Sequence, residues 1–440
     1  MAQRVGTYTY GSEPTERLPY GIGRVTGPWL FAAALAAGAF GFGVYAYYRQ
    51  YTEGEVITGM RDIGTMGGTP WGLYVVFIAY FVGVSFAGII LAALIRLMNL
   101  HQLKPVARIA EVLTVIALVC AACCVLADLG NPIRGLLNLP RYARPGSPLF
   151  GTFTLVISGY MFASLVYLYL DSRRDAMICA RVPGRLQTFH RIWAAGYRDT
   201  PAQRRRHYTA SFWLAIAIVP LLVTAHSTLG FVFGLQIGRP GWHSALQAPS
   251  FVIMAGVSGT GLLIVAAAIM RRALGEQERL TGEVFRWLNN LLLVLILAYL
   301  YLWIVETLSS VYQGGEQEVE VTRALFTGEY ATLFWLVLAL LLSALALLIA
   351  QFFRPGLALV AGVTAGVLVN VAAIFKRFLL VIPSQTHGPL LPYSPGHYSP
   401  TWVEYGVVIG LFGFGTLLFI GFAKTFPIIH LPEAEKERAA

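Results

Sequence analysis

Residues 71–95 read WGLYVVFIAYFVGVSFAGIILAALI, a run of 25 residues without one charged side chain. Roughly 20 apolar residues in a helix are enough to cross the hydrocarbon core of a bilayer. A bilayer offers no water to backbone N–H and C=O groups, so a run like this favours a helix over an open strand. The stretch therefore predicts a transmembrane helix.

The rest of the chain has the same character. Of its 440 residues, 57% are hydrophobic and 12% are charged, whereas soluble domains carry about 25% charged residues. Too little polar surface remains to cover a soluble globule, and we predict an all-α integral membrane protein with about ten transmembrane helices. The predicted spans are 29–48, 71–95, 106–127, 150–170, 211–235, 250–270, 287–311, 330–350, 356–381 and 405–423.

Lysine and arginine in the connections predict the orientation, because cytoplasmic loops are enriched in both. With the N-terminus inside, 23 of the 32 Lys and Arg residues fall on the inner side, and the largest group of them lies in 171–207. We expect a multi-pass protein of a bacterial-type inner (cytoplasmic) membrane, with a cytoplasmic N-terminal segment (1–28) and a cytoplasmic C-terminus. The basic stretch is also compatible with anionic lipid; nucleic acid is not an expected partner.

A weak internal repeat organises the spans. Residues 83–90 read GVSFAGII and residues 256–263 read GVSGTGLL, and both stretches run from the outside inward. The repeat predicts two four-helix bundles, spans 2–5 (71–238) and spans 6–9 (250–381), flanked by span 1 (29–48) and by span 10 with its cytoplasmic tail (405–440). The alternative is that the two stretches are alike only because helix packing favours small residues at such positions.

The last outer connection, 382–404, is rich in proline and aromatic residues. Its residues 383–404 read PSQTHGPLLPYSPGHYSPTWVE, with five prolines. An ordered, extended loop of this kind could serve as a platform for a partner protein, and a plain surface loop is the alternative.

Ionisable residues inside a membrane are costly and are functional candidates by default. Asp128 and His226 fall toward the outer side of the same predicted bundle. A carboxylate and an imidazole can together exchange the protons of a quinone head group, so we predict both as catalytic residues. The alternatives are that Asp128 pairs with Arg134 and that His226 makes a hydrogen bond between helices.

Three further residues are candidates for a proton path. Glu111 lies near the inner end of span 3, whereas Glu306 and Lys376 lie toward the outer ends of spans 7 and 9. The alternatives are that Glu111 pairs with Arg108, and that Glu306 and Lys376 form an ion pair between helices.

Cofactor chemistry is not expected within this chain. Of the eight histidines only His226 is deep in a span, and a bis-histidine haem needs two. Cys120, Cys123 and Cys124 lie inside span 3, which is not the loop scaffold of a metal cluster. We therefore expect no haem or metal bound by this chain, and redox centres held by a partner.

Several motifs resemble the NrfD family, also called the polysulfide reductase membrane-subunit family. They are Thr69-Pro70-Trp71-Gly72-Leu73-Tyr74, Ala110-Glu111, Asp128-Leu129-Gly130-Asn131-Pro132, and the C-terminal Pro383, Pro392, Tyr398, Pro400, Thr401 and Glu404.

The resemblance implies a haem-free subunit that reacts with menaquinone or ubiquinone as substrate. It also implies a ferredoxin-like iron–sulfur partner, in some members with molybdopterin or multihaem subunits. The quinone-binding residues that we predict on this basis are Trp71, Tyr74, Asp128, Arg134 and His226.

We therefore expect the quinone-reactive subunit of an oxidoreductase complex, with proton movement as an optional coupled step, rather than an enzyme on its own. Two other classes stay open, a secondary transporter with a site in mid-membrane and a structural membrane anchor. Transporters often contain inverted repeats, whereas the repeat here is parallel.

Overall fold

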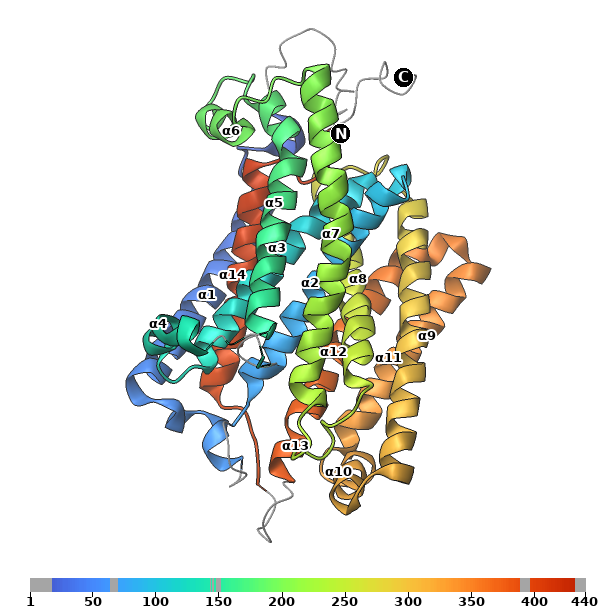
Figure 1. The fold of residues 1–440 in the computed structure, drawn as a ribbon. Helices are drawn as coiled ribbons and strands as arrows, with labels where there is room; N and C mark the ends of the chain where they lie inside the picture. Colours follow the sequence, from blue (N-terminus) through green and yellow to red (C-terminus); the bar gives the residue numbers. More distant parts are fainter. Residues whose placement is uncertain are drawn as a thin grey trace.

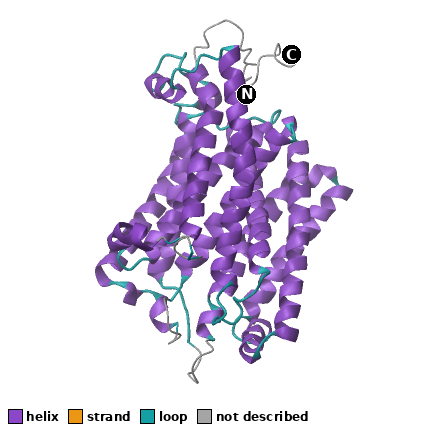
Figure 2. Cartoon of the chain, viewed as in Figure 1, coloured by secondary structure: helices purple, strands orange, loops and turns teal. Residues whose placement is uncertain are grey.

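The computed structural model describes residues 18–63, 70–142, 144, 146–147, 152–387 and 396–431. Residues 1–17 of the predicted N-terminal segment, 388–395 of the predicted outer loop and 432–440 of the predicted tail lie outside this range. Every regular element within it is a helix (Figure 2). The predicted all-α class is confirmed.

Each of the ten predicted spans coincides with a helix. Over the described residues, nine helices are long and apolar enough to cross a membrane, and α2 adds a further helix of 25 residues. The spans are α1 (Gly27–Glu53), α2 (Leu73–Leu97), α3 (Lys104–Asp128), α5 (Phe153–Cys179), α7 (Pro201–Gly234), α8 (Gln247–Leu274), α9 (Gly282–Gln313), α11 (Ala331–Phe353), α12 (Ala358–Val381) and α14 (Trp402–Thr425).

Short helices lie at the two ends of the long ones (Figure 1). One end, called the α6 end, carries α6 (Gln187–Ala194). The other, called the α10 end, carries α4 (Pro132–Tyr142), α10 (Glu316–Phe326) and α13 (Pro383–Thr386). The 3₁₀ turns are Pro19–Gly21, Glu55–Ile57, Gly59–Asp62, His101–Leu103 and Pro355–Leu357.

The long helices pack as two rings of four. In the first ring α2 packs on α3, α3 on α5, α5 on α7, and α7 back on α2. In the second, α8, α9, α11 and α12 repeat this order. The rings meet where α8 contacts α2 and α7, and where α12 contacts α2, while α1 and α14 pair with each other beside α3.

The two repeated segments face each other across the junction of the rings. A Cβ atom on Gly83 of α2 would lie 3.5 Å from Ser258 Oγ and 3.7 Å from Ala255 Cα, both on α8. Similarly, Gly261 of α8 lies against the backbone of Gly366 of α12. Small residues at these contacts let the helix backbones approach closely, as membrane helices commonly do.

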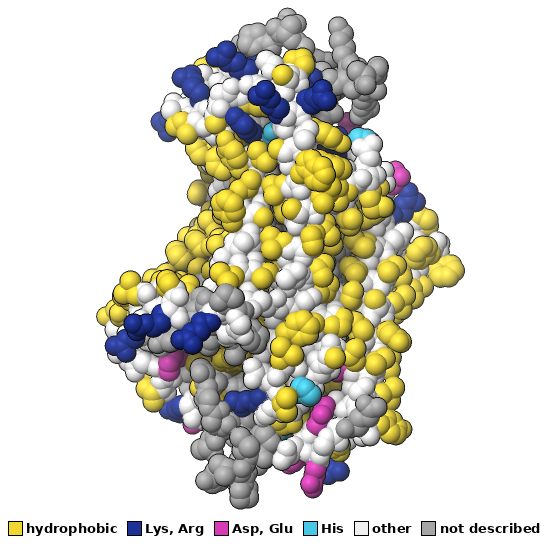
Figure 3. Space-filling model, in the orientation of Figure 1, with side chains coloured by type: hydrophobic (Ala, Val, Ile, Leu, Met, Phe, Trp, Pro, Cys, Tyr) yellow, Lys and Arg dark blue, Asp and Glu magenta, His cyan; other side chains and the backbone are white. Residues whose placement is uncertain are grey.

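The outer surface of the helices is strongly apolar. Phe31, Phe162 and Trp213 are 73%, 69% and 64% exposed. Soluble monomers rarely expose apolar patches of this extent. Figure 3 shows hydrophobic side chains over the middle of the visible face, with Lys and Arg gathered toward its ends. This distribution fits a multi-pass integral membrane protein whose middle is covered by lipid.

Candidate functional site

Three carboxyl groups gather at the α10 end of the first ring. Asp128 is the last residue of α3, Glu55 lies in the turn after α1, and Glu404 lies in the first turn of α14. They are near enough to act on one another electrostatically. We call these three residues the carboxyl cluster. Within the described ranges, no ion pair joins any of them to a Lys or Arg.

Glu404 is fully buried and fully used by hydrogen bonds. Its Oε2 accepts from the backbone N–H of Gly59 at 2.8 Å and of Thr401 at 2.9 Å. Thr401 and Glu404 form a capping box, which satisfies free N–H groups at the start of α14. Glu404 also accepts from the Tyr398 hydroxyl, which itself accepts from the N–H of Leu73 at 2.6 Å. This carboxylate therefore fixes the starts of α2 and α14.

Gln50 of α1 connects the other members of the site. Its Nε2 donates to Glu55 Oε1 at 2.8 Å and to the carbonyl of Ala127 at 2.9 Å. Its Oε1 accepts from the Tyr74 hydroxyl on α2. Gln50 is only 3% exposed. The Gln50 amide thus links α1 to α2 and to the end of α3, next to Glu55 and Asp128.

Two carboxyl oxygens of the cluster are buried without a partner. Asp128 Oδ1 and Glu55 Oε2 have no hydrogen bond among the described residues. Leaving such an atom unsatisfied costs about 1–3 kcal/mol, and native structures generally avoid it. Burial raises the pKa of Glu55 and the Glu404 carboxylate adds to this, while the Gln50 hydrogen bond lowers it. Carboxyl oxygens of this kind can take up a proton or accept a hydrogen bond from a donor.

The other predicted quinone-binding residues differ in position. Tyr74 belongs to the site through Gln50. Trp71 exchanges two hydrogen bonds with Gln385, both 2.8 Å long, and its ring stacks on Trp242 at 5.4 Å between centroids. Arg134 is exposed on α4 and makes no ion pair with Asp128 in the part of the chain that the structure describes. The alternative of an Asp128–Arg134 pair is thus not what the structure shows.

His226 lies in α7 and connects that helix to α2. Its Nδ1 lies 2.8 Å from the carbonyl of Leu222, and its Nε2 lies 2.8 Å from the carbonyl of Val82. The ring is 1% exposed and packs edge-on against Phe86. Both nitrogens are occupied by backbone carbonyls, so His226 makes no hydrogen bond to Asp128, which like it lies in the described part of the chain. With the proton on Nε2, the contact with Val82 is a hydrogen bond from α7 to α2.

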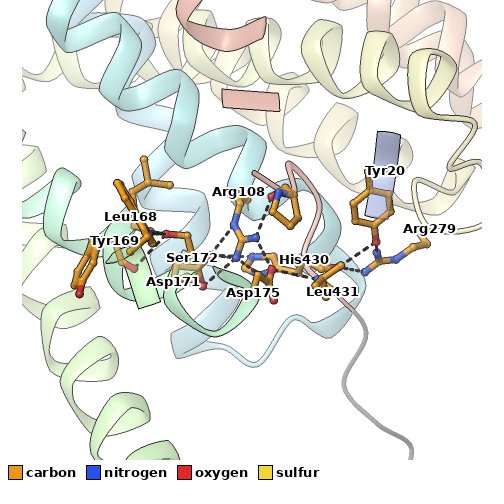
Figure 4. A network of polar contacts seen from close by, with 12 residues as sticks. Tyr20, Arg108, Leu168, Tyr169, Asp171, Ser172, Asp175, Arg279, His430 and Leu431 are labelled. Carbon is orange, nitrogen blue, oxygen red and sulfur yellow. Dashed lines mark hydrogen bonds and ion pairs between the residues drawn. The ribbon is translucent and has the colours of Figure 1, made fainter. Parts of the chain in front are cut away.

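A second buried polar group lies at the α6 end (Figure 4). Arg108 of α3 is fully buried and donates to Asp171 at 3.0 Å, to Asp175 and to the carbonyl of Pro427 at 3.0 Å. His430 Nδ1 lies 3.0 Å from Arg108 Nη2, and His430 Nε2 lies 3.2 Å from Asp171 Oδ2. We call Arg108, Asp171, Asp175 and His430 the arginine network. It fastens the C-terminal segment to α3 and α5.

The arginine network extends to the second ring and to the N-terminal side of the chain. Arg279, which precedes α9, donates to the backbone carbonyl of His430 and to the Tyr20 hydroxyl (Figure 4). Burial lowers the pKa of His430 to about 4, although Asp171 raises it. His430 is therefore neutral at physiological pH.

Glu111 lies one turn deeper than Arg108 and beside Asp171. It is 1% exposed, and its Oε2 has no partner among the residues that the structure describes. Arg108 forms its ion pairs with Asp171 and Asp175 rather than with Glu111.

Glu306 and Lys376 are not paired directly. Glu306 Oε1 accepts from Gln247 Nε2 at 2.6 Å, and Lys376 Nζ lies 4.6 Å above the Trp303 ring. Both residues are described, and no ion pair within 4.0 Å joins the two. The predicted ion-pair alternative does not describe this contact.

Gln50, Glu55 and the roles of Tyr398 and Glu404 are not predicted from the sequence. Gln50 is neutral and Glu55 falls outside the predicted spans, so a search for charges inside spans passes over both. The Thr401-x-x-Glu404 spacing is the one local signal, because it is a capping-box pattern.

A family model covers most of the chain. Residues 61–388 match the model described as polysulphide reductase, NrfD. The chain belongs to the NrfD family. The matched region runs from the turn after α1 through α13 and contains Asp128, Glu111 and His226.

Three relatives extend the comparison over about nine-tenths of the chain. An inferred dimethyl sulfoxide reductase membrane subunit from Halobacterium salinarum is 29% identical and covers 91% of both chains. A selenate reductase subunit from Mesobacillus selenatarsenatis is 25% identical and covers 88% of this chain and 92% of its own. The Hdr-like menaquinol oxidoreductase integral membrane subunit of Archaeoglobus fulgidus is 25% identical and covers 90% and 92%.

Proposed function

We propose that this protein is the quinone-binding membrane subunit of a multi-subunit respiratory oxidoreductase. The observation that carries the proposal is the pair of buried carboxyl oxygens on Asp128 and Glu55 that have no partner among the described residues. A quinol offers two hydroxyl donors, one for each of these two acceptor oxygens. The relatives named as reductase and menaquinol oxidoreductase subunits support the same class of complex.

The carboxyl cluster handles protons in this proposal. Oxidation of a quinol to a quinone releases two protons and two electrons. Asp128 and Glu55 each accept one proton from a quinol hydroxyl, and the two electrons leave to an iron–sulfur partner. Reduction of a quinone runs the same steps in reverse. Gln50 and Tyr74 hold the carboxyl groups in place, since Gln50 bonds to both Glu55 and Tyr74.

The partner would dock at the α10 end, which we assign to the outer face. The basic stretch 171–207 lies at the α6 end around α6, and the positive-inside rule puts that end in the cytoplasm. Both termini are then cytoplasmic, in a bacterial-type inner membrane. A ferredoxin-like iron–sulfur subunit, with or without molybdopterin or multihaem subunits, would face the carboxyl cluster and the residues near 396–404.

Glu111 fits a proton path from the α6 end in this scheme. Its Oε2 has no hydrogen-bond partner among the described residues and lies beside the arginine network. This carboxyl group is therefore available to bind and release a proton. Glu306 and Lys376 are the matching candidates in the second ring. His226 contributes by holding α7 to α2 near the middle of the first ring.

Quinol-linked turnover of the purified complex tests the proposal. Asp128→Asn keeps the size of the side chain and removes the proton acceptor, so turnover should fall about 10²–10⁴-fold. Asp62→Asn is the matched control, because Asp62 lies at the same end with an exposed side chain; it should keep wild-type turnover. Wild-type turnover in Asp128→Asn would overturn the proposal.

A further inference from the structure

The second ring contains a buried arginine and a partly buried lysine that form no ion pair with any described residue. Arg377 of α12 is 5% exposed, and its guanidinium carbon lies 3.7 Å from the centroid of the Phe251 ring on α8. The neighbouring Lys376 lies over Trp303. Neither cation makes a side-chain hydrogen bond or an ion pair with any residue that the structure describes. Both belong to the part of α12 that runs into α13 at the α10 end.

The nearest carboxylate does not neutralise this pair. Glu306 acts electrostatically on both cations, but no ion pair within 4.0 Å forms between these described residues, and its Oε1 is occupied by Gln247. Two cations face one carboxylate, and one positive charge is left over. Ser250 precedes Phe251 on α8, and its buried Oγ makes no hydrogen bond within the described ranges.

Arg108 shows how the same molecule satisfies a buried guanidinium. It has two carboxylates and backbone carbonyls as acceptors. Arg377 lies over an aromatic face and has no acceptor within hydrogen-bonding distance among the described residues. A cation–π contact contributes about 0.5–2 kcal/mol, whereas removing an ion from water costs several kcal/mol. The five N–H donors of a guanidinium fit an oxyanion particularly well.

We propose that Arg377 and Lys376 form an oxyanion-binding site where α12 meets α8 and α9, separate from the carboxyl cluster. The ligand chemistry is that of phosphate or sulfate oxygens. The phosphate of an anionic phospholipid and a free oxyanion are its two sources. Arg377 supplies the paired donors, Lys376 supplies the second charge, and Phe251 forms the apolar wall beneath the guanidinium.

The experiment has two arms on the purified protein in its complex. In the first, native mass spectrometry measures retention of phosphatidylglycerol against phosphatidylcholine after exchange into mixed-lipid nanodiscs. In the second, the thermal midpoint is measured in detergent while sulfate replaces chloride at constant ionic strength. A bound ligand raises the midpoint because it stabilises only the folded state.

The wild type should either retain phosphatidylglycerol selectively or show a sulfate-dependent rise of its thermal midpoint. The arm that responds identifies the source of the oxyanion. Arg377→Gln should lower lipid retention about tenfold or abolish the sulfate-dependent rise. Arg377→Lys keeps a charge and should retain part of the effect, which keeps the test valid if the glutamine variant folds poorly. Arg354→Gln alters an exposed arginine and should behave as wild type.

The inference is overturned if wild type shows neither effect, or if Arg377→Gln matches wild type in the arm that responds. Asp128→Asn should leave both arms unchanged, because the carboxyl cluster is a separate site. Failure of the proposed quinone site and failure of the oxyanion site are thus read from different variants.

Discussion

The carboxyl cluster and the arginine network lie at opposite ends of α3, and both contain buried polar atoms. In the arginine network, Arg108 forms ion pairs with Asp171 and Asp175, and His430 contacts both Arg108 and Asp171. In the carboxyl cluster, three acids lie together without a described cation, and two of their oxygens have no described partner. Burial alone therefore does not mark a reactive site. The network is satisfied and holds helices together, whereas the cluster is incomplete without a ligand or protons.

The contrast between the two groups should be clearest when the network loses its cation. Arg108→Met leaves Asp175 without its cation and leaves Asp171 with only Arg96 and His430, which should destabilise the fold by about 3–5 kcal/mol. The thermal midpoint in detergent measures the loss. Arg181→Met, at an exposed position of the same end, is the control and should change little. A variant as stable as wild type would show that the network does not hold the fold.

A change at Glu55 tests the cluster as a proton site. Glu55→Gln keeps an acceptor for Gln50 but cannot take a proton, so quinol oxidation should slow about 10–100-fold. The pKa of Glu55 is raised, so wild-type activity should fall with decreasing pH at a higher pH than an ordinary glutamate would cause. The variant should lose this limb of the pH–rate profile. An identical profile in both proteins would exclude Glu55 as a proton acceptor.

Tyr398 contacts the carboxyl cluster, and we expect it to stabilise the fold without taking part in the proton transfers. Tyr398→Phe leaves the buried N–H of Leu73 without its acceptor, which should cost about 1–3 kcal/mol of stability. Turnover per folded protein should change far less than in Asp128→Asn. Thermal unfolding and activity measured on the same sample check both statements, and a turnover loss without a stability loss would reverse the assignment.

The weakest response at neutral pH is expected at His430. Its folded pKa is about 4, below the ordinary value near 6.5, so the unfolded chain binds a proton that the folded chain resists. The stability contributed by neutral His430 is complete above about pH 6.5 and is lost as the pH falls toward 4. His430→Gln should therefore show a shallower decline of the thermal midpoint over this range, and equal slopes would contradict it.

The spans are predictable because length and composition decide them. The sequence predicts a span at 150–170, and α5 runs over Phe153–Cys179. The additional turns at the end of α5 place Asp171 and Asp175 beside Arg108. Hydropathy predicts only the part of a helix that lies in the bilayer, so it does not predict these ion pairs. Asp128 is identifiable from the sequence because a charge inside a span is costly.

The surroundings of Asp128 are harder to predict. Gln50 bonds to the carbonyl of Ala127 beside it, and Glu404 lies near it, only because α1 and α14, far apart in sequence, pack together beside α3. His226 is identifiable as a deep polar residue, but its position on a helix cannot reveal that Val82 and Leu222 occupy both of its nitrogens. Tertiary packing decides which buried groups are satisfied.

Photo-cross-linking with an azido-quinone, followed by mass-spectrometric location of the labelled peptides, asks directly where the quinone binds. The quinone should label the α10 end of the first ring, on peptides that contain Gln50, Tyr74 and Asp128. An excess of unmodified quinol should prevent the labelling. Specific labelling confined to the second ring, or labelling unaffected by competing quinol, would contradict the assignment of the carboxyl cluster as the quinone site.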